Sequence, residues 1–299
     1  MAGEGVELTL QLAPRVQPLL QARIAGLGER APADLSYCNL WLFRRAHGWR
    51  FHEGEWPLIS GRSYDGDSHV LPLFDLATAP AAALQDMTGR HGSLFPLSGR
   101  EIAVLDPLRF RVDANPDDAD YVYPAEQFRR YPGRVLHKKR NLMAQFTSAH
   151  AVTALPYAPT LRDEALAVLD GWLADKHKQP GEADDLPCRE ALAHAAELGL
   201  EGFMVRADGA PAGFLLAEEL QPGAWVIRFA KGLARYTGVA QYLFQHFALH
   251  APRPAQWLNF EQDLGLPNFR RTKQSYQPAF LLPKWRASQL AQDREGRIG

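Results

Sequence analysis

The order of elements predicted for the second half of the chain constrains the fold most. Helical periodicity covers 160–176 and 187–198, and an Asp208-Gly209 turn joins the first two of three strand-like segments that follow, at 202–206, 212–218 and 225–230. The remaining patterns are helix 238–250, strand 256–261, helix 267–276 and strand 279–282. The chain from residue 160 onward is therefore predicted to form a mostly antiparallel sheet flanked by helices.

A three-stranded meander followed by helix, strand, helix and strand is the element order of the GNAT acyltransferase fold. The first half shows a comparable set of elements and is interpreted as a degenerate copy. Pro156 and Pro159 interrupt the patterns between the halves. The predicted fold class is α/β (α+β), as tandem GNAT-like domains. We expect an N-terminal degenerate domain over 1–155, a C-terminal domain with the donor site over 156–288, and a flexible tail over 289–299.

Composition narrows the class of protein. Of 299 residues, 46% are hydrophobic and 22% are charged, as in ordinary globular proteins. No stretch approaches the roughly 18 uncharged apolar residues of a membrane span, and the N-terminus lacks a signal-peptide pattern. We therefore expect a cytoplasmic protein, with any membrane contact peripheral. Cys38 and Cys188 form no paired motif and the histidines show no ligand spacing, so no metal is expected.

The charges are segregated although the net charge is only −1. Residues 127–162 hold seven Lys or Arg and no acid, while 220–260 hold four and 264–292 hold five, again without acids. Such segregation predicts a basic face that attracts phosphates. The alternative is that folding interleaves these segments with acidic ones.

A first candidate site is the segment Arg235-Tyr-Thr-Gly-Val-Ala240, which follows a predicted strand and opens a helix. Its pattern, R-x-x-G-x-A, matches loops that hold the pyrophosphate of acyl-CoA in GNAT enzymes. Gly238 would let a phosphate approach the backbone and free N–H groups, while Lys231 and Arg235 add positive charge. Lys231, Arg235, Gly238 and Ala240 are therefore candidate cofactor-binding residues. The alternative is an ordinary glycine at a helix start.

A second candidate is the basic run Lys138, Lys139, Arg140 and Asn141 on a predicted helix near 134–149. Consecutive helical residues point in different directions, so these side chains cannot all bind one phosphate. Asn141 shares a face with Lys138 or with His137. We expect substrate-binding roles here, with a solvated basic helix as the alternative.

A third candidate lies at the end of the strand 256–261. Strand alternation places Asn259, Glu261 and Asp263 on one side if the strand continues. Glu261 is the best general base, Tyr276 is a possible proton donor and Asn259 completes the catalytic set. Asp263 and Lys273 are candidate substrate-binding residues. The alternative is that Glu261 forms a structural salt bridge with Arg270, Arg271 or Lys273.

Four motifs, in order, resemble the DUF2156 family, that of the C-terminal domain of phosphatidylglycerol lysyltransferases. They are DYVY at 120–123, KKRN at 138–141, NFEQDLG at 259–265 and KQSYQP at 273–278, and the resemblance spans about 14–286. It implies a tandem GNAT-like fold, an aminoacyl-tRNA donor and a lipid hydroxyl acceptor. The related Fem ligases use the same donor with an amine acceptor. Unlike the lysyltransferases, this sequence contains no membrane-spanning segment.

These features predict transfer of an aminoacyl group from aminoacyl-tRNA to a hydroxyl or amine by direct attack. The donor ester would bind between strands 225–230 and 256–261, where backbone N–H groups of the first strand polarise its carbonyl. Arg235 and the run 138–140 would hold donor phosphates. Two alternatives remain: an acyl-CoA-dependent N-acyltransferase, and a non-catalytic module that binds a nucleotide, tRNA or lipid headgroup. The module predicts that internal bonds occupy Glu261 and Tyr276.

Overall fold

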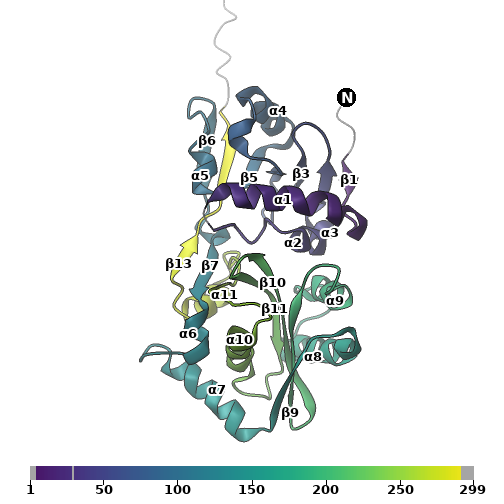
Figure 1. Ribbon diagram of the computed structural model, residues 1–299, viewed down its shortest axis with the longest axis vertical. Coiled ribbons are helices and arrows are strands. Elements are labelled where there is room, and N and C mark those ends of the chain that lie inside the picture. The colour runs from purple at the N-terminus through teal and green to yellow at the C-terminus, as the bar shows by residue number, and fades with distance from the viewer. Residues whose placement is uncertain (1–4, 29, 291–299) are drawn as a thin grey trace, which may run out of the picture. The chain divides into compact units, whose positions relative to one another are not determined.

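A computed structural model describes residues 5–28 and 30–290, and the chain folds into two compact units (Figure 1). Unit 1 combines the chain up to Ala119 with the segment from Pro283. Unit 2 is Asp120–Leu282. The chain therefore crosses between the units twice.

Unit 1 contains one sheet and five α-helices among its described residues. Its strands are β1 (Val6–Glu7), β2 (Arg50–His52), β3 (Leu58–Arg62), β4 (Ser68–Pro72), β5 (Ser93–Leu97), β6 (Phe110–Ala114) and β14 (Trp285–Gln289). Its helices are α1 (Ala13–Leu27), α2 (Tyr37–Leu42), α3 (Arg44–His47), α4 (Ala81–His91) and α5 (Gly99–Ile102), with 3-10 turns η1 (Leu10–Leu12), η2 (Leu76–Thr78) and η3 (Pro116–Asp118). The strand order is β1-β2-β3-β4-β5-β14-β6, with β4 and β5 parallel and joined through α4.

Unit 2 repeats this plan. Its strands are β7 (Asp120–Pro124), β8 (Val152–Pro156), β9 (Glu201–Ala207), β10 (Ala210–Gln221), β11 (Ala224–Gly232), β12 (Trp257–Asn259) and β13 (Phe280–Leu282). Its helices are α6 (Ala125–Arg130), α7 (His137–Ala149), α8 (Arg162–Asp175), α9 (Asp185–Ala193), α10 (Val239–His250) and α11 (Pro267–Gln274), with the 3-10 turn η4 (Pro159–Leu161). The strand order is β8-β9-β10-β11-β12-β7-β13, with β11 and β12 parallel and joined through α10.

Helices cover both faces of the unit 2 sheet. Figure 1 shows α10 on one face and α8 with α9 on the other. Under α10 lies an aromatic core that includes Phe128, Phe146, Trp225, Phe247 and Tyr276. Burial of these large side chains is the main stabilising contribution, about 25 cal/mol for each Å² of apolar surface.

The two sheets correspond strand by strand, and each takes its sixth strand from elsewhere in the chain. β7 follows β6 in sequence but pairs with β12 and β13 in unit 2. β14 follows β13 but pairs with β5 and β6 in unit 1. The expected domain boundary after residue 155 falls inside unit 2, because β8 pairs with β9 along Val152–Pro156.

The end of the chain also carries structure beyond the sequence prediction. The expected tail begins at 289, but Gln289 is the last residue of β14 and pairs with Phe110. Residues 291–299 of the expected tail lie outside the described residues. The separate strand 285–289 was not anticipated, because its partners in β5 and β6 lie far away in sequence.

Candidate functional site

The parallel strands β11 and β12 diverge after three residue pairs. Ala224 pairs with Trp257 and Val226 with Asn259, after which β11 continues to Gly232 while β12 ends. The sheet is therefore open between the second half of β11 and the segment after Asn259. Sheets with parallel strands joined by helices commonly bind ligands at the carboxyl ends of such strands.

A β-bulge lies in β11 at this opening. Leu216 of β10 pairs with Phe229 and Ala217 pairs with Ile227, so Arg228 has no partner residue in the ladder. Bulges bend a strand and redirect a side chain, and they are frequent beside active sites. Here the redirected side chain is an arginine, the one charged residue between Trp225 and Ala230.

Arg228 joins two carboxylates at the opening. Its side chain is only 1% exposed, its Nε donates to Oε1 of Glu218 at 2.6 Å, and its Nη1 forms an ion pair with Glu261. Glu218 is 12% exposed and Glu261 is 25% exposed, so Glu261 is the member of this network most accessible to a ligand. The sequence analysis missed Arg228, although a lone charge inside Trp225–Ala230 was an available signal.

The segment that carries Glu261 is a turn and not a strand. β12 ends at Asn259, and Glu261 has a left-handed backbone with φ of 58°. Asn259 holds this turn: its Oδ1 accepts from the Glu261 N–H at 2.7 Å, and its Nδ2 donates to Oδ2 of Asp120 at 2.9 Å. The predicted strand through 261 was wrong, because the asparagine side chain replaces a ladder partner.

Asp263 and Lys273 reinforce the same turn from inside. Lys273 Nζ donates to the backbone carbonyls of Glu261, at 3.2 Å, and Gln262. Asp263 accepts from the Tyr121 hydroxyl at 2.7 Å and from Arg270 Nε at 2.8 Å. Burial acts to raise the pKa of Asp263, but these hydrogen bonds outweigh it and lower the pKa to about 2.

The structure pairs Glu261 with an arginine that the sequence analysis did not name. Arg270 pairs with Asp263, and the ammonium group of Lys273 binds carbonyl oxygens. The partner that the structure gives to Glu261 is Arg228, from a strand 33 residues earlier. Asp263 and Lys273, predicted to bind substrate, hold the turn that presents Glu261.

Tyr276 lies in the aromatic core of unit 2. The residue is 3% exposed, and its hydroxyl accepts from Gln241 Nε2 at 2.8 Å. Burial raises the pKa of Tyr276 to about 12. Internal bonds thus engage both Tyr276 and Glu261, as the binding-module hypothesis expects, but only Glu261 keeps substantial exposure.

The glycine of the R-x-x-G-x-A segment meets another helix. Gly238 has φ of 95°, and a Cβ there would lie 1.9 Å from the Leu142 carbonyl oxygen of α7. Close backbone approach therefore accounts for the glycine without a phosphate. Arg235 and Ala240 are exposed beside it, whereas Lys231 is buried in an ion pair with Asp184 at 2.6 Å.

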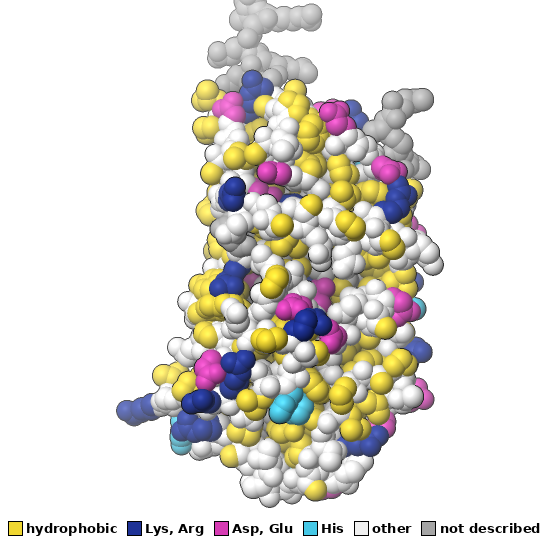
Figure 2. All heavy atoms as spheres, viewed as in Figure 1, with side chains coloured by type: hydrophobic (Ala, Val, Ile, Leu, Met, Phe, Trp, Pro, Cys, Tyr) yellow, Lys and Arg dark blue, Asp and Glu magenta, His cyan; other side chains and the backbone are white. Residues whose placement is uncertain are grey.

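The basic run of α7 spreads in different directions, as the helical spacing predicts. Lys139 Nζ lies 4.0 Å from the ring centroid of Tyr276, and Arg140 Nη1 donates to the Tyr131 carbonyl at 2.7 Å. Asn141 contacts His137 at 3.3 Å. Lys138 is exposed, and Figure 2 shows Lys and Arg side chains gathered at the lower left, where Figure 1 places α6 and α7. This surface is the α6–α7 basic surface, with Arg134 and Lys138 as exposed members.

Residues 5–28 and 30–290 contain no group of three or more His, Cys, Asp or Glu side chains that could hold a metal ion. Both cysteines are buried, and neither forms a disulfide. Within the same part of the chain, no helix combines the length and apolarity needed to cross a bilayer.

The two sheets and their flanking helices define a protein with a tandem GNAT-like fold, and the comparisons agree. A family model described as "Phosphatidylglycerol lysyltransferase, C-terminal" matches residues 26–288. The chain belongs to this family, which confirms the resemblance drawn from the four motifs. A search of curated proteins by sequence finds no match.

Several solved structures share the fold. A conserved protein of unknown function from Bacteroides thetaiotaomicron has a TM-score of 0.80 at 21% identity, covering 96% of this chain and 99% of that one. The structure of L-PGS from Bacillus licheniformis has a TM-score of 0.62 at 12% identity, covering 96% and 93%. The crystal structure of FemX has a TM-score of 0.62 at 7% identity, covering 96% of this chain and 98% of that one. The predicted tandem GNAT-like fold class is thereby confirmed.

Proposed function

We propose that this protein is an aminoacyltransferase that passes an aminoacyl group from aminoacyl-tRNA to a hydroxyl or amine acceptor. One observation carries the proposal: a partly exposed Glu261 is fixed by the buried Arg228 at the opening between β11 and β12. A carboxylate held on a rigid partner at a sheet opening is placed to act as a general base. Family membership supports the aminoacyl-transfer class.

In the proposed reaction, the acceptor attacks the donor ester carbonyl directly. Glu261 takes the proton of the attacking hydroxyl or amine, and backbone N–H groups on the open side of β11 stabilise the oxyanion. The ester C–O bond to the tRNA ribose breaks, and the protonated Glu261 returns its proton to the ribose oxygen that leaves. Arg228 and Asn259 are positioning residues, because they act through Glu261. Tyr276 takes no part in this proton transfer, since its hydroxyl lies in the core.

The α6–α7 basic surface supports a polyanionic donor. Arg134 and Lys138 are exposed there, and no acid occurs between 127 and 162. Each phosphate contact releases condensed counterions, so tRNA binding should weaken steeply with salt. The variant Lys138→Gln should reduce the slope of log affinity against log salt by about one. An unchanged slope would remove Lys138 from the tRNA contact.

A second candidate donor is acyl-CoA. It is favoured by the position of the loop from Arg235 to Ala240, which joins the end of β11 to the start of the twelve-residue helix α10. Exposed Arg235 beside a helix N-terminus suits a phosphate. Acetyl-CoA binding that is lost in Arg235→Ala would favour this donor. Tight tRNA binding without acetyl-CoA binding would favour the first.

The transfer assay uses radiolabelled lysyl-tRNA with phosphatidylglycerol vesicles and, separately, with a peptide amine. Glu261→Gln should lower the transfer rate by about 100-fold, while tRNA affinity stays within about twofold. The matched control is Glu197→Gln, which removes an exposed carboxylate on the surface of unit 2. Full activity of Glu261→Gln would refute the base role. A wild-type protein that binds tRNA but transfers to neither acceptor would favour the binding module.

A further inference from the structure

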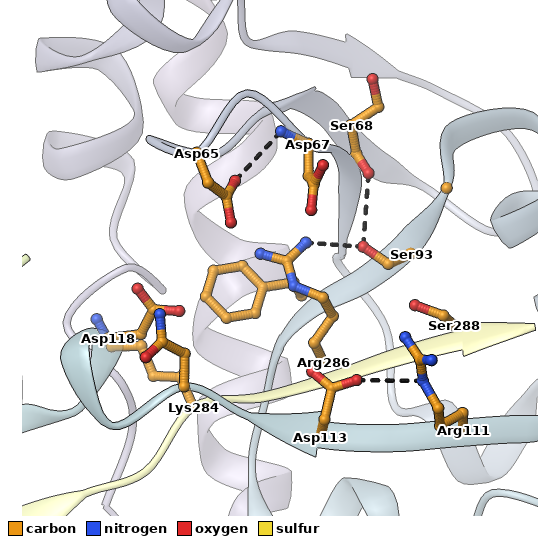
Figure 3. A pocket seen from close by; sticks show the side chains of 13 residues that line it. Asp65, Asp67, Ser68, Ser93, Arg111, Asp113, Asp118, Lys284, Arg286 and Ser288 are labelled. Carbon is orange, nitrogen blue, oxygen red and sulfur yellow. Dashed lines mark hydrogen bonds and ion pairs between the residues drawn. The ribbon is translucent and has the colours of Figure 1, made fainter.

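Unit 1 contains a polar cavity of about 410 Å³ on its sheet (Figure 3). Its wall combines side chains from β4, β5, β6 and β14 with the loop that carries Asp65 and Asp67 and the turn that carries Asp118. The volume is that of a small-molecule site. Nothing in the proposed aminoacyl transfer uses this cavity.

Arg286 on β14 is the central cation of the cavity. Its guanidinium stacks on Phe95, 4.3 Å from the ring centroid, and its Nη1 donates to Ser93 Oγ at 2.9 Å. The other contact is a long one, 3.4 Å, from Nη2 to Ser63 Oγ. Among the described residues no carboxylate lies within ion-pair distance of Arg286. A guanidinium that is fixed by stacking and bonded only to hydroxyls is suited to bind a carboxylate through its planar fork.

Carboxylates stand across from this arginine. Figure 3 shows Asp65, Asp67 and Asp118 around the guanidinium, on the side away from the Arg111–Asp113 pair. Asp118 is half-buried, and within the described chain no group donates a hydrogen bond to its carboxylate. Burial raises the pKa of Asp118, partly offset by Lys284. A cationic ligand group that donates a hydrogen bond to this half-buried carboxylate would stabilise its charged form.

The other charged side chains of the wall already have partners, one of them outside the wall. Arg111 lies 3.5 Å from Asp113, and Lys284 forms a buried ion pair with Asp34. What remains is one guanidinium and three carboxylates. The cavity therefore offers one anion site and an excess of cation sites.

We propose that this cavity binds a free α-amino acid, with its carboxylate on Arg286 and its ammonium group on Asp118. The acidic excess favours an amino acid with a second cationic group over a neutral one. The two ends are recognised by opposite charges, so a molecule that lacks either end should bind less well. The proposal concerns binding to unit 1 and does not depend on the transfer reaction.

The test is isothermal titration calorimetry of the full chain with four ligands: L-lysine, L-alanine, L-lysinamide and Nα-acetyl-L-lysine. Lysine should bind most tightly. Lysinamide, without the carboxylate, and acetyl-lysine, without the α-ammonium group, should each bind about tenfold more weakly or worse. Equal affinity for all four, or heat from none, would overturn the proposal.

Two variants assign the ends. Arg286→Gln should weaken the affinity for lysine about tenfold or more and leave the affinity for lysinamide within about twofold. Asp118→Asn should weaken the affinity for lysine but not the affinity for acetyl-lysine. The controls are Arg90→Gln and Asp86→Asn, an exposed pair on α4 outside the cavity. Circular dichroism checks folding, and Arg286→Lys, which keeps the charge, provides a second arm if Arg286→Gln does not fold. Unchanged lysine affinity in both Arg286→Gln and Asp118→Asn would refute the assignment.

Discussion

Gly238→Ala is the substitution whose effect the structure defines most sharply. Gly238 precedes α10 with φ of 95°, and it lies against the backbone of α7. An added Cβ would lie 1.9 Å from the Leu142 oxygen, whereas ordinary contacts begin near 3.4 Å. Because the obstacle is backbone, no side-chain rotation relieves it, and α7 must move away from α10 by about 1.5 Å.

The expected loss of stability has two parts. A left-handed backbone costs alanine about 1–2 kcal/mol. Forced separation of packed helices adds about 1–3 kcal/mol, as in other overpacked sites. Gly238→Ala should therefore lower the free energy of unfolding by about 2–5 kcal/mol.

Gly133→Ala is the matched control, because Gly133 also has positive φ, 73°, but a Cβ there meets nothing within 4 Å. It should lose only the backbone part, about 1–2 kcal/mol. Urea unfolding gives the totals, and hydrogen exchange in the peptide 239–250 reports on α10 directly. If the two variants lost equal unfolding free energy, the contact of Gly238 with α7 would be refuted. The phosphate-loop interpretation would then again be the explanation for this glycine.

The remaining predictions concern charges buried in unit 2. Arg228→Met removes the buried partner of Glu218 and should lower the unfolding free energy by about 3 kcal/mol, measured by urea titration. The control Arg253→Met, at a half-exposed arginine, should lower it by less than about 1 kcal/mol in the same assay. Asp263 has its pKa lowered from 3.8 to about 2, so its folded carboxylate stabilises the protein above about pH 4 and that contribution is lost as pH falls towards 2. Asp263→Asn should therefore be less stable by about 2 kcal/mol at pH 7, and its difference from wild type should shrink on acidification; a difference constant with pH would contradict this.

The candidate site could be predicted only in part. The choice of Glu261 followed from a polar residue after a strand, and the structure leaves it the most exposed member of its ion-pair network. Its partner could not be predicted, because Arg228 reaches it through a bulge that depends on the register of β10 against β11. The burial of Tyr276 could not be predicted either, because the sequence pattern around a residue next to a turn does not show whether its side chain faces the core.

The sequence by itself determined the type and order of the elements in the second half, from α8 to β13. These elements follow from side-chain periodicity and turn residues, which act over a few positions and need no distant partner. The tertiary structure alone decided which unit takes β7 and which takes β14. A strand satisfies its backbone hydrogen bonds with whichever edge it meets, so a five-residue segment does not encode its partner. The exchange of these strands, the boundary between the units and the cavity around Arg286 all depend on that choice.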